Sequence, residues 1–394
     1  CFPFVTLITA FANLFGLGGA PLCAMARGKG NREGAQGIMV NAGFMLLLSG
    51  AVLTVLGIAF HRPLLYLFGA SEVTYPYASS YIVIYLLGTL CVMLSLGLNP
   101  YINCQGFART GMLTVALGAA ANIVLDPIFI FALHLGVRGA AIATVLSQLL
   151  SAAWVVKFLT GKKAELKLDF RGFRPDWHCI QRITVLGIAS FVMSFTDMLV
   201  QVACNSMLRG FGGDLYISVM TVLNSVRQIA QTPVLAIADG ASTAISYNYG
   251  AGLYKRTRDA IRFMTQIAIG YTMLVWMLVS LFPALFIRIF NQDAELVAAA
   301  VPALHIYFFG FVMMAFQYAG QSTFRALGRA KYAVFFSLLR KAFIVVPLTL
   351  LLPYCWNLGV SGVFAAEPVS NCIGGLACYF TMRHVVMPEL KMEN

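Results

Sequence analysis

Runs of mainly apolar residues long enough to span a membrane recur along almost the whole chain, and this feature constrains the fold most. A helix needs about 20 such residues to cross a hydrocarbon core, and backbone amides find no water there, so helices are expected. With 60% hydrophobic and only 11% charged residues, the chain has the composition of a membrane protein. The apolar runs predict eleven spans: 2–27, 33–60, 77–103, 110–133, 137–160, 181–208, 215–247, 259–287, 297–324, 330–353 and 359–383.

A polar connection, "GKKAELKLDFRGFRPDWH" at 161–178, divides the chain near its middle and is interpreted as a linker between two lobes. Only four of the 27 lysine and arginine residues fall in loops on the opposite side: Arg62, Arg138, Arg209 and Arg288. Nearly all others lie at span ends on the linker's side, which is therefore predicted to be cytoplasmic. Attraction to anionic lipid headgroups explains the net charge of +12, and no nucleic-acid partner is expected.

The chain contains a weak internal repeat. "LGVRGAAIATVLS", from Leu135, recurs as "LGVSGVFAAEPVS", from Leu358, and Gly106 meets Gly328 at an offset of 222 residues. Each repeat holds six spans, so the two halves are expected to point the same way across the membrane. On this pairing the partner of the span at 181–208 would precede residue 1, so the chain is expected to lack about one N-terminal helix.

The segment "NIVLDPIFIF" at 122–131, the "LGVRGAAIAT" that follows it, the turn "ARGKGNREGA" and its second-half counterpart "SYNYGAGLYKRTRDA" resemble the multidrug and toxic-compound extrusion (MATE) family. The resemblance covers nearly the whole chain. It implies an all-α membrane protein with two pseudo-symmetric six-helix lobes around a central cleft, present here as five plus six helices. The predicted domains are an N-lobe at 1–160 (helices 2–6), a cytoplasmic linker at 161–180, a C-lobe at 181–384 (helices 7–12) and a cytoplasmic tail at 385–394.

Asp126 is a carboxylate in an otherwise apolar run. A charge at membrane depth costs about 3 kcal/mol on insertion scales, so such residues usually face a cavity or an ion path. Asn122 lies one turn earlier on the same face, and Pro127 leaves a carbonyl, nominally that of Ile123, without its usual partner. These oxygens could hold Na⁺, or the carboxylate could carry H⁺; the alternative is an aspartate hydrogen-bonded as structural support. Because the MATE resemblance implies an ion-coupling aspartate in this motif, Asp126 and Asn122 are the predicted coupling residues.

Polar residues also follow helical spacing on two faces of the second lobe. The predicted substrate-cavity residues are Asp197, Gln201, Asn205, Asn224, Gln228, Gln231 and Asp239. The two acids would attract a cationic substrate, unless Arg227 pairs with one of them and neutralises it. Glu367 and Arg340 are predicted to form a structural ion pair between adjacent helices.

The resemblance implies an antiporter that exports amphipathic organic cations and drugs in exchange for H⁺ or Na⁺ by alternating access. The expected partners are these small molecules and the lipid bilayer, and a monomer in the plasma (inner) membrane is expected. No catalytic residue, no cofactor beyond the coupling ion and no metal beyond Na⁺ near Asp126 is predicted, because the sequence contains neither a DxxxD pair nor a histidine-centred motif of the kind membrane enzymes use. The alternative is a flippase for lipid-linked saccharides. Its pyrophosphate headgroup calls for several cations in the cleft, and only Arg227, Arg340 and Lys341 lie at depth.

Overall fold

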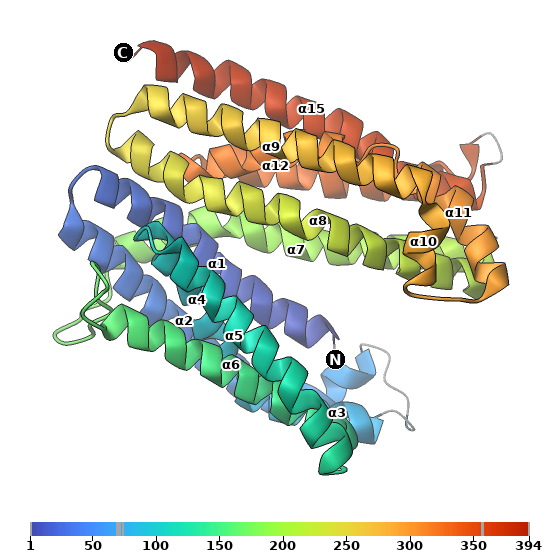
Figure 1. Cartoon of the computed structure of the whole chain (residues 1–394), viewed down its shortest axis with the longest axis horizontal. Coiled ribbons are helices and arrows are strands. Elements are labelled where there is room, and N and C mark those ends of the chain that lie inside the picture. Colours follow the sequence, from blue (N-terminus) through green and yellow to red (C-terminus); the bar gives the residue numbers. More distant parts are fainter. Residues whose placement is uncertain (1, 68–71, 73–74, 356–357, 393–394) are drawn as a thin grey trace. The chain divides into compact units, whose positions relative to one another are not determined.

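The structure is a computed structural model, and it describes residues 2–67, 72, 75–355 and 358–392. Throughout these residues every regular element is a helix (Figure 1). Seven helices are long and apolar enough to cross a membrane, and the number rises to nine if each of two bent pairs is one span. Two more polar helices, α8 (Gly213–Gly250) and α15 (Val360–Met392), occupy the remaining predicted spans. The predicted all-α membrane fold is confirmed.

Large apolar side chains project outward from many helices. Phe309 is 74% exposed, Ile123 73% and Phe343 69%. Apolar surface on this scale is rare on a soluble monomer, whereas lipid tails cover it without cost. The exposed surface therefore agrees with a chain that crosses a membrane several times.

The chain separates into two compact units, Cys1–Phe191 and Val192–Asn394. The division falls inside α7 (Trp177–Phe211), whose first half packs on α1 (Phe2–Gly28) in the first unit. A Cβ atom on Gly187 would lie 1.8 Å from the Leu14 carbonyl oxygen, so the two helices touch through their backbones there. The start of the predicted C-lobe at 181 therefore packs with the first unit, and the lobe boundaries themselves stay a prediction.

The first unit is built from α1, the first half of α7 and five further elements. These are α2 (Arg32–Leu67), α3 (Tyr75–Leu87), α4 (Thr89–Cys104), α5 (Ala108–Pro127) with the π-helical η1 (Ile128–Ala132), and α6 (Gly136–Thr160). The central helix is α4, which contacts α1, α2, α5 and α6. Its buried residues include Met93, Leu98 and Tyr101, and these form the middle of the unit's core.

The second unit is built from the rest of α7, α8, α15 and the helices between them. These are α9 (Tyr254–Leu281), α10 (Pro283–Arg288), α11 (Ala294–Phe308), α12 (Met313–Ala326), α13 (Ala330–Leu338), the π-helical η2 (Leu339–Val345) and α14 (Val346–Leu351). The central helix is α12, which contacts α8, α9, α13 and α15. Nearly every residue of α12 is buried, including Gln317 and Gln321.

The internal repeat is visible in the backbone. The pair α3 and α4 is bent by 54° and the pair α11 and α12 by 49°, and Gly88 and Gly310, 222 residues apart, lie at the two bends. Gly106 and Gly328, at the same offset, both end a helix with a positive φ, of 88° and 71°. Only glycine adopts this conformation without strain, so the repeated glycines mark equivalent helix ends.

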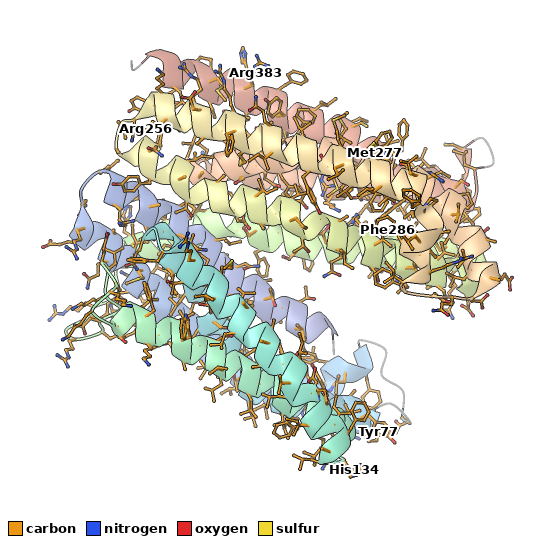
Figure 2. The ribbon with its side chains drawn as sticks, viewed as in Figure 1. Tyr77, His134, Arg256, Met277, Phe286 and Arg383 are labelled. Atoms are coloured by element: carbon orange, nitrogen blue, oxygen red, sulfur yellow. The ribbon has the colours of Figure 1, made fainter. Side chains whose placement is uncertain are left out.

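Basic residues gather at one end of each unit. In the first unit Arg27, at the end of α1, donates to the Cys104 carbonyl and pairs with Glu165 of the linker. In the second unit Arg256 and Arg383 lie toward one end and Phe286 toward the other (Figure 2). This clustering is the pattern that the predicted sidedness requires.

The expected span at 110–133 and the one at 330–353 both contain a π-helical segment. In the first, η1 begins directly after Pro127, which lacks an N–H and cannot continue the regular hydrogen-bond pattern. In the second, η2 carries Arg340 and Lys341 at the middle of the span. Single π-helical turns widen a helix locally and occur frequently at functional sites.

Candidate functional site

The predicted coupling residues of the first unit lie side by side on α5. The Asn122 amide donates from Nδ2 to Asp126 Oδ1 over 3.2 Å, and both side chains are half-buried. The spacing of four residues brings them to the same helical face, as predicted. An amide donor on one carboxylate oxygen leaves the other oxygen available for a proton or an ion.

A cavity of about 230 Å³, lined by both polar and apolar side chains, lies next to Asn122, and the sequence did not predict it. Hydroxyl and amide groups line it: Ser95 Oγ donates to Gln148 Oε1 over 2.7 Å, and Ser151 Oγ donates to the Thr114 carbonyl over 3.2 Å. These residues come from α4, α5 and α6. The signal that could have revealed them is the spacing of Ser147 and Ser151, which places two hydroxyls on one face of α6.

The groups around Asp126 limit how an ion could be held there. Within the described residues no three His, Cys, Asp or Glu side chains come together in a way that could hold a metal ion. A Na⁺ ion near Asp126 would therefore take one carboxylate and the neutral oxygens of amides, hydroxyls or carbonyls, which are ligands that hard cations accept. A proton needs only the carboxylate.

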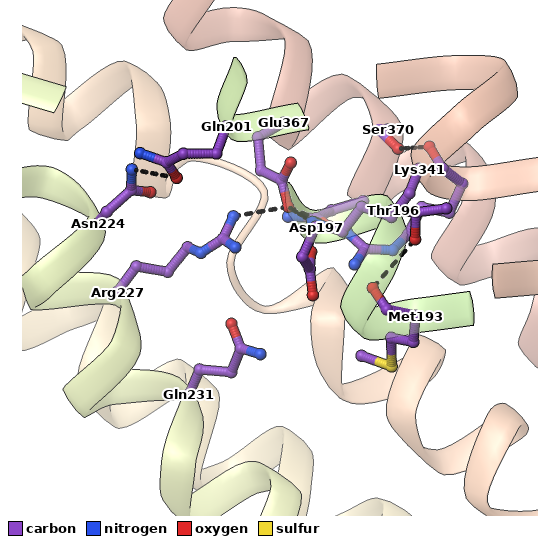
Figure 3. Close-up of polar contacts among 12 residues, drawn as sticks. Met193, Thr196, Asp197, Gln201, Asn224, Arg227, Gln231, Lys341, Glu367 and Ser370 are labelled. Carbon is purple, nitrogen blue, oxygen red and sulfur yellow. Dashed lines mark hydrogen bonds and ion pairs between the residues drawn. The ribbon is translucent and has the colours of Figure 1, made fainter. Parts of the chain in front are cut away.

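In the second unit five charged side chains meet in what we call the charged cluster: Asp197, Arg227, Arg340, Lys341 and Glu367 (Figure 3). They come from four elements, α7, α8, η2 and α15. One oxygen atom, Glu367 Oε1, lies 2.8 Å from Arg227 Nη1, 3.0 Å from Arg340 Nη1 and 3.0 Å from Lys341 Nζ. The other carboxylate oxygen of Glu367 is buried and has no hydrogen-bond partner among the described residues.

The structure therefore contains the predicted ion pair of Glu367 and Arg340 and adds two further cations to it. Arg340 is also held by Asn371, whose Oδ1 accepts from its Nη1 over 2.7 Å. Two local features place the basic side chains. The π-helical η2 lets the consecutive residues Arg340 and Lys341 reach the same carboxylate, and Gly374 leaves room for the arginine stem, since a Cβ there would lie 2.9 Å from Arg340 Cγ.

Each of the two predicted cavity acids has a basic partner. Asp197 Oδ1 lies 2.8 Å from Lys341 Nζ, and Asp239 Oδ1 lies 2.9 Å from Arg325 Nη2. The alternative in which Arg227 neutralises one of these acids is not what the structure contains, because Arg227 pairs with Glu367. The pairing of Asp239 draws it away from the charged cluster, toward the basic end of the unit.

The neutral residues of the predicted cavity divide into those whose side chains make hydrogen bonds and those for which none is described. Asn224 donates to Gln201 Oε1 over 3.0 Å and accepts from the Tyr307 hydroxyl, which in turn accepts from Arg227. Gln231 donates to the Tyr318 hydroxyl. The first three contacts extend the charged cluster into a polar network, and the contact between Gln231 and Tyr318 is separate from it. Gln228 is exposed and no polar partner of its side chain is described, and the side-chain oxygen of Asn205 is buried without a hydrogen bond.

Sequence reasoning missed Tyr307 as a member of this network and did not pair Lys341 with an acid. Lys341 was predicted only to be one of three cations at membrane depth, and Tyr307 lies in a span with many aromatic residues. The available signal was the pair of consecutive basic residues in an apolar span, because two such charges are too costly at membrane depth unless acids meet both.

A comparison with known proteins gives the family. The MatE family model matches residues 1–128 and 189–351. The chain belongs to the MatE family. MatE-family proteins are membrane transporters, so the chain is a multi-pass membrane protein of the plasma membrane.

Curated relatives match over nearly the whole chain. The multidrug export protein MepA of Staphylococcus haemolyticus is 24% identical over 379 residues, which are 96% of this chain and 82% of that protein. The FAD transporter of Shewanella oneidensis is 24% identical over an alignment of 400 positions, which covers 98% of this chain and 86% of that protein. The chain is thus similar to transporters named for different cargoes.

Solved structures share the fold. A MATE transporter in the bent conformation superposes with a TM-score of 0.93 at 23% identity, covering 100% of this chain and 87% of that one. A MOP superfamily transporter from Pyrococcus furiosus, described by the reverse polarity of its binding pocket, superposes with a TM-score of 0.94 at 23% identity, covering 99% and 87%. The predicted MATE-like fold is confirmed by this likeness.

Proposed function

We propose that the chain exports amphipathic organic compounds in exchange for H⁺ or Na⁺ by alternating access. Membership of the MatE family and the match to a multidrug export protein support the transport of drug-like molecules. The observation that carries ion coupling is the half-buried Asn122 and Asp126 pair, because it lies in a mainly apolar helix beside a cavity whose lining includes hydroxyl and amide groups. A carboxylate in this position can change its charge without opening the core of the unit.

Coupling requires that ion and cargo bias the same conformational equilibrium in opposite directions. Protonation or Na⁺ binding at Asp126 changes the charge on α5 and the hydrogen bond that Asn122 makes. We infer that this change favours the state that releases the cargo outside. The structural alternative, in which Asp126 only supports the bundle, predicts no dependence of transport on its charge.

The substrate charge needs separate treatment. The sequence-based prediction of organic cations rested on Asp197 and Asp239, and both acids have basic partners. The names of the relatives include a drug exporter and a transporter of FAD, which is an anion, so the charge of the cargo has to come from the site itself. The relatives give no support to the flippase alternative, since neither is named for a lipid-linked saccharide.

Efflux from vesicles tests this proposal. The purified protein would be reconstituted into vesicles loaded with ethidium or, separately, with 1-naphthyl phosphate, and a proton gradient and a sodium gradient would be imposed one at a time. We expect one gradient to drive efflux of a probe in the parent protein. Asp126→Asn keeps the shape of the side chain and its ability to accept a hydrogen bond, but makes it permanently neutral. It should reduce gradient-driven efflux to the level of probe-loaded vesicles without protein.

Asp214→Asn is the matched control, because Asp214 is exposed in the first turn of α8 and the same chemical change is made there. It should leave efflux at the parental rate. If Asp126→Asn also pumps at the parental rate, the aspartate is a structural residue and the ion path lies elsewhere.

A further inference from the structure

We propose that the charged cluster of the second unit binds the anionic group, a carboxylate or phosphate, of the exported compound. The inference rests on the proposed function, since it names the class of cargo for an exporter. It differs from the expectation of organic cations that the sequence alone gives. Three observations carry it: the charge balance of the cluster, the unused donors of its arginines and the side from which it is exposed.

The first observation is the charge balance. Three cations, Arg227, Arg340 and Lys341, meet two acids, Asp197 and Glu367, so the cluster has one excess positive charge. No other charged side chain pairs with these five among the described residues, and the nearby acid Asp239 is taken by Arg325. An uncompensated charge is costly in a low-dielectric interior, and an anion that enters the cluster would neutralise it.

The second observation concerns the arginine donors. A guanidinium has five N–H donors in a planar fork that fits a carboxylate or phosphate through two parallel hydrogen bonds. Arg227 uses only Nη1, toward Glu367 and Tyr307, and Arg340 uses only Nη1, toward Glu367 and Asn371. The Nε and Nη2 groups of both have no partner in the described part of the chain. Neither arginine has a nitrogen that is fully buried and unsatisfied.

The third observation is the direction of access. The side chains of Arg340, Lys341 and Glu367 are only 2% to 4% exposed and form the base of the cluster. Asp197 is 38% exposed and Arg227 17% exposed, so they form its open side. Gln201 and Asn224 stand beside them as neutral hydrogen-bonding groups (Figure 3). A ligand arriving on this side meets both Asp197 and Arg227, and the charge of Asp197 is balanced by Lys341.

Binding of two charge-opposed probes tests the inference. 1-Naphthyl phosphate and 1-naphthylmethylammonium share the same aromatic body, and their binding to the purified protein would be measured by calorimetry in detergent without any ion gradient. We expect the parent protein to bind the phosphate more tightly than the ammonium. Arg227→Gln, which removes one charge and the accessible fork, should weaken binding of the phosphate at least about tenfold.

The decisive variant is Asp197→Asn. It removes one acid and raises the excess charge of the cluster, so the phosphate should bind at least about tenfold more tightly. An increase in affinity cannot arise from a misfolded protein, which separates this test from a loss of structure. Asp214→Asn, an equal change at an exposed acid outside the cluster, is the matched control and should change the affinity by less than about twofold.

Several outcomes would overturn the inference. Tighter binding of the ammonium than of the phosphate would mean that Asp197 attracts cations despite its partner. Equal affinities of Asp197→Asn and the parent for the phosphate would mean that the cluster does not hold the ligand. A failure of ion coupling and a failure of the anion site give different results, because efflux in an ion gradient tests Asp126 whereas calorimetry without a gradient tests the charged cluster.

Discussion

The two units repeat one backbone design but differ in the chemistry of their interiors. Both contain a helix pair bent by about 50° at glycines 222 residues apart, and both have a π-helical segment in the span that follows. The first unit has one acid, Asp126, beside a cavity whose lining includes neutral hydroxyl and amide groups. The second has a cluster of five charges, in which three cations lie around a single carboxylate oxygen of Glu367 and Asp197 pairs with Lys341. A repeat can therefore preserve where helices bend and end while its side chains specialise for different tasks.

This contrast is the basis for proposing different roles for the two interiors. Asp126 has one described hydrogen-bond partner, Asn122, so a change of its charge would alter one contact. Glu367 holds three cations, and the loss of its charge would leave all three facing one another. We therefore assign ion coupling to the first unit and ligand binding to the second, as the proposals above state.

The largest effect is expected from Glu367→Gln. Removing this charge leaves three buried cations with only Asp197 to offset them, and breaking a buried ion pair typically costs about 3 to 5 kcal/mol. We expect a large fall in the thermal midpoint in detergent, measured by intrinsic fluorescence. A midpoint within a few degrees of the parent would show that water or lipid already screens the cluster, and the contrast between the units would be weaker than the structure indicates.

The equivalent bends should respond unequally to alanine. A Cβ on Gly310 would lie 2.6 Å from the carbonyl oxygen of Pro368, which is backbone, whereas on Gly88 it would lie 2.6 Å from a methyl of Val145. A side chain can rotate away and a backbone cannot, so Gly310→Ala should cost about 1 to 3 kcal/mol and Gly88→Ala about 1 kcal/mol or less. Thermal midpoints of both variants measure this. The reverse order would contradict the tighter backbone contact in the second unit.

A smaller effect is expected at the cavity of the first unit. Ser95→Ala removes the donor to Gln148 and should lower the free energy of unfolding by about 1 kcal/mol. Ser80→Ala is the control, because its hydroxyl is exposed and bonds only to a carbonyl in its own helix. Equal midpoints for the two variants would indicate that water replaces the lost hydrogen bond in the cavity.

The smallest effect on stability is expected from Asp126→Asn. The amide retains the size of the side chain and can still accept from Asn122. The free energy of unfolding, derived from the thermal midpoint, should therefore change by less than about 1 kcal/mol. This near-neutral result is what separates a coupling residue from a structural one, since transport should be lost while the fold is kept. A destabilisation as large as that of Glu367→Gln would erase the difference between the two interiors.

The sequence by itself determined the class of fold, the repeat and one of the two polar centres. Apolar runs of membrane length specify helices because backbone groups in lipid must be satisfied within the helix, and the offset of Gly106 and Gly328 follows from equivalent helix ends. The neighbouring positions of Asn122 and Asp126 follow from helical spacing alone. The pairing of Glu367 with Arg340 could also be predicted, because each charge in an apolar span requires a partner.

Only the tertiary structure decided which charges meet. Four different helical elements carry Asp197, Arg227, Lys341 and Glu367. The spacing of residues along one helix does not show which face of a second helix they contact. From the sequence, Arg227 could pair with Asp197 or with Asp239. In the structure Arg227 pairs with Glu367, and Asp197 pairs with Lys341. The excess of one positive charge is a property of this three-dimensional set, because it depends on how far each carboxylate lies from each cation.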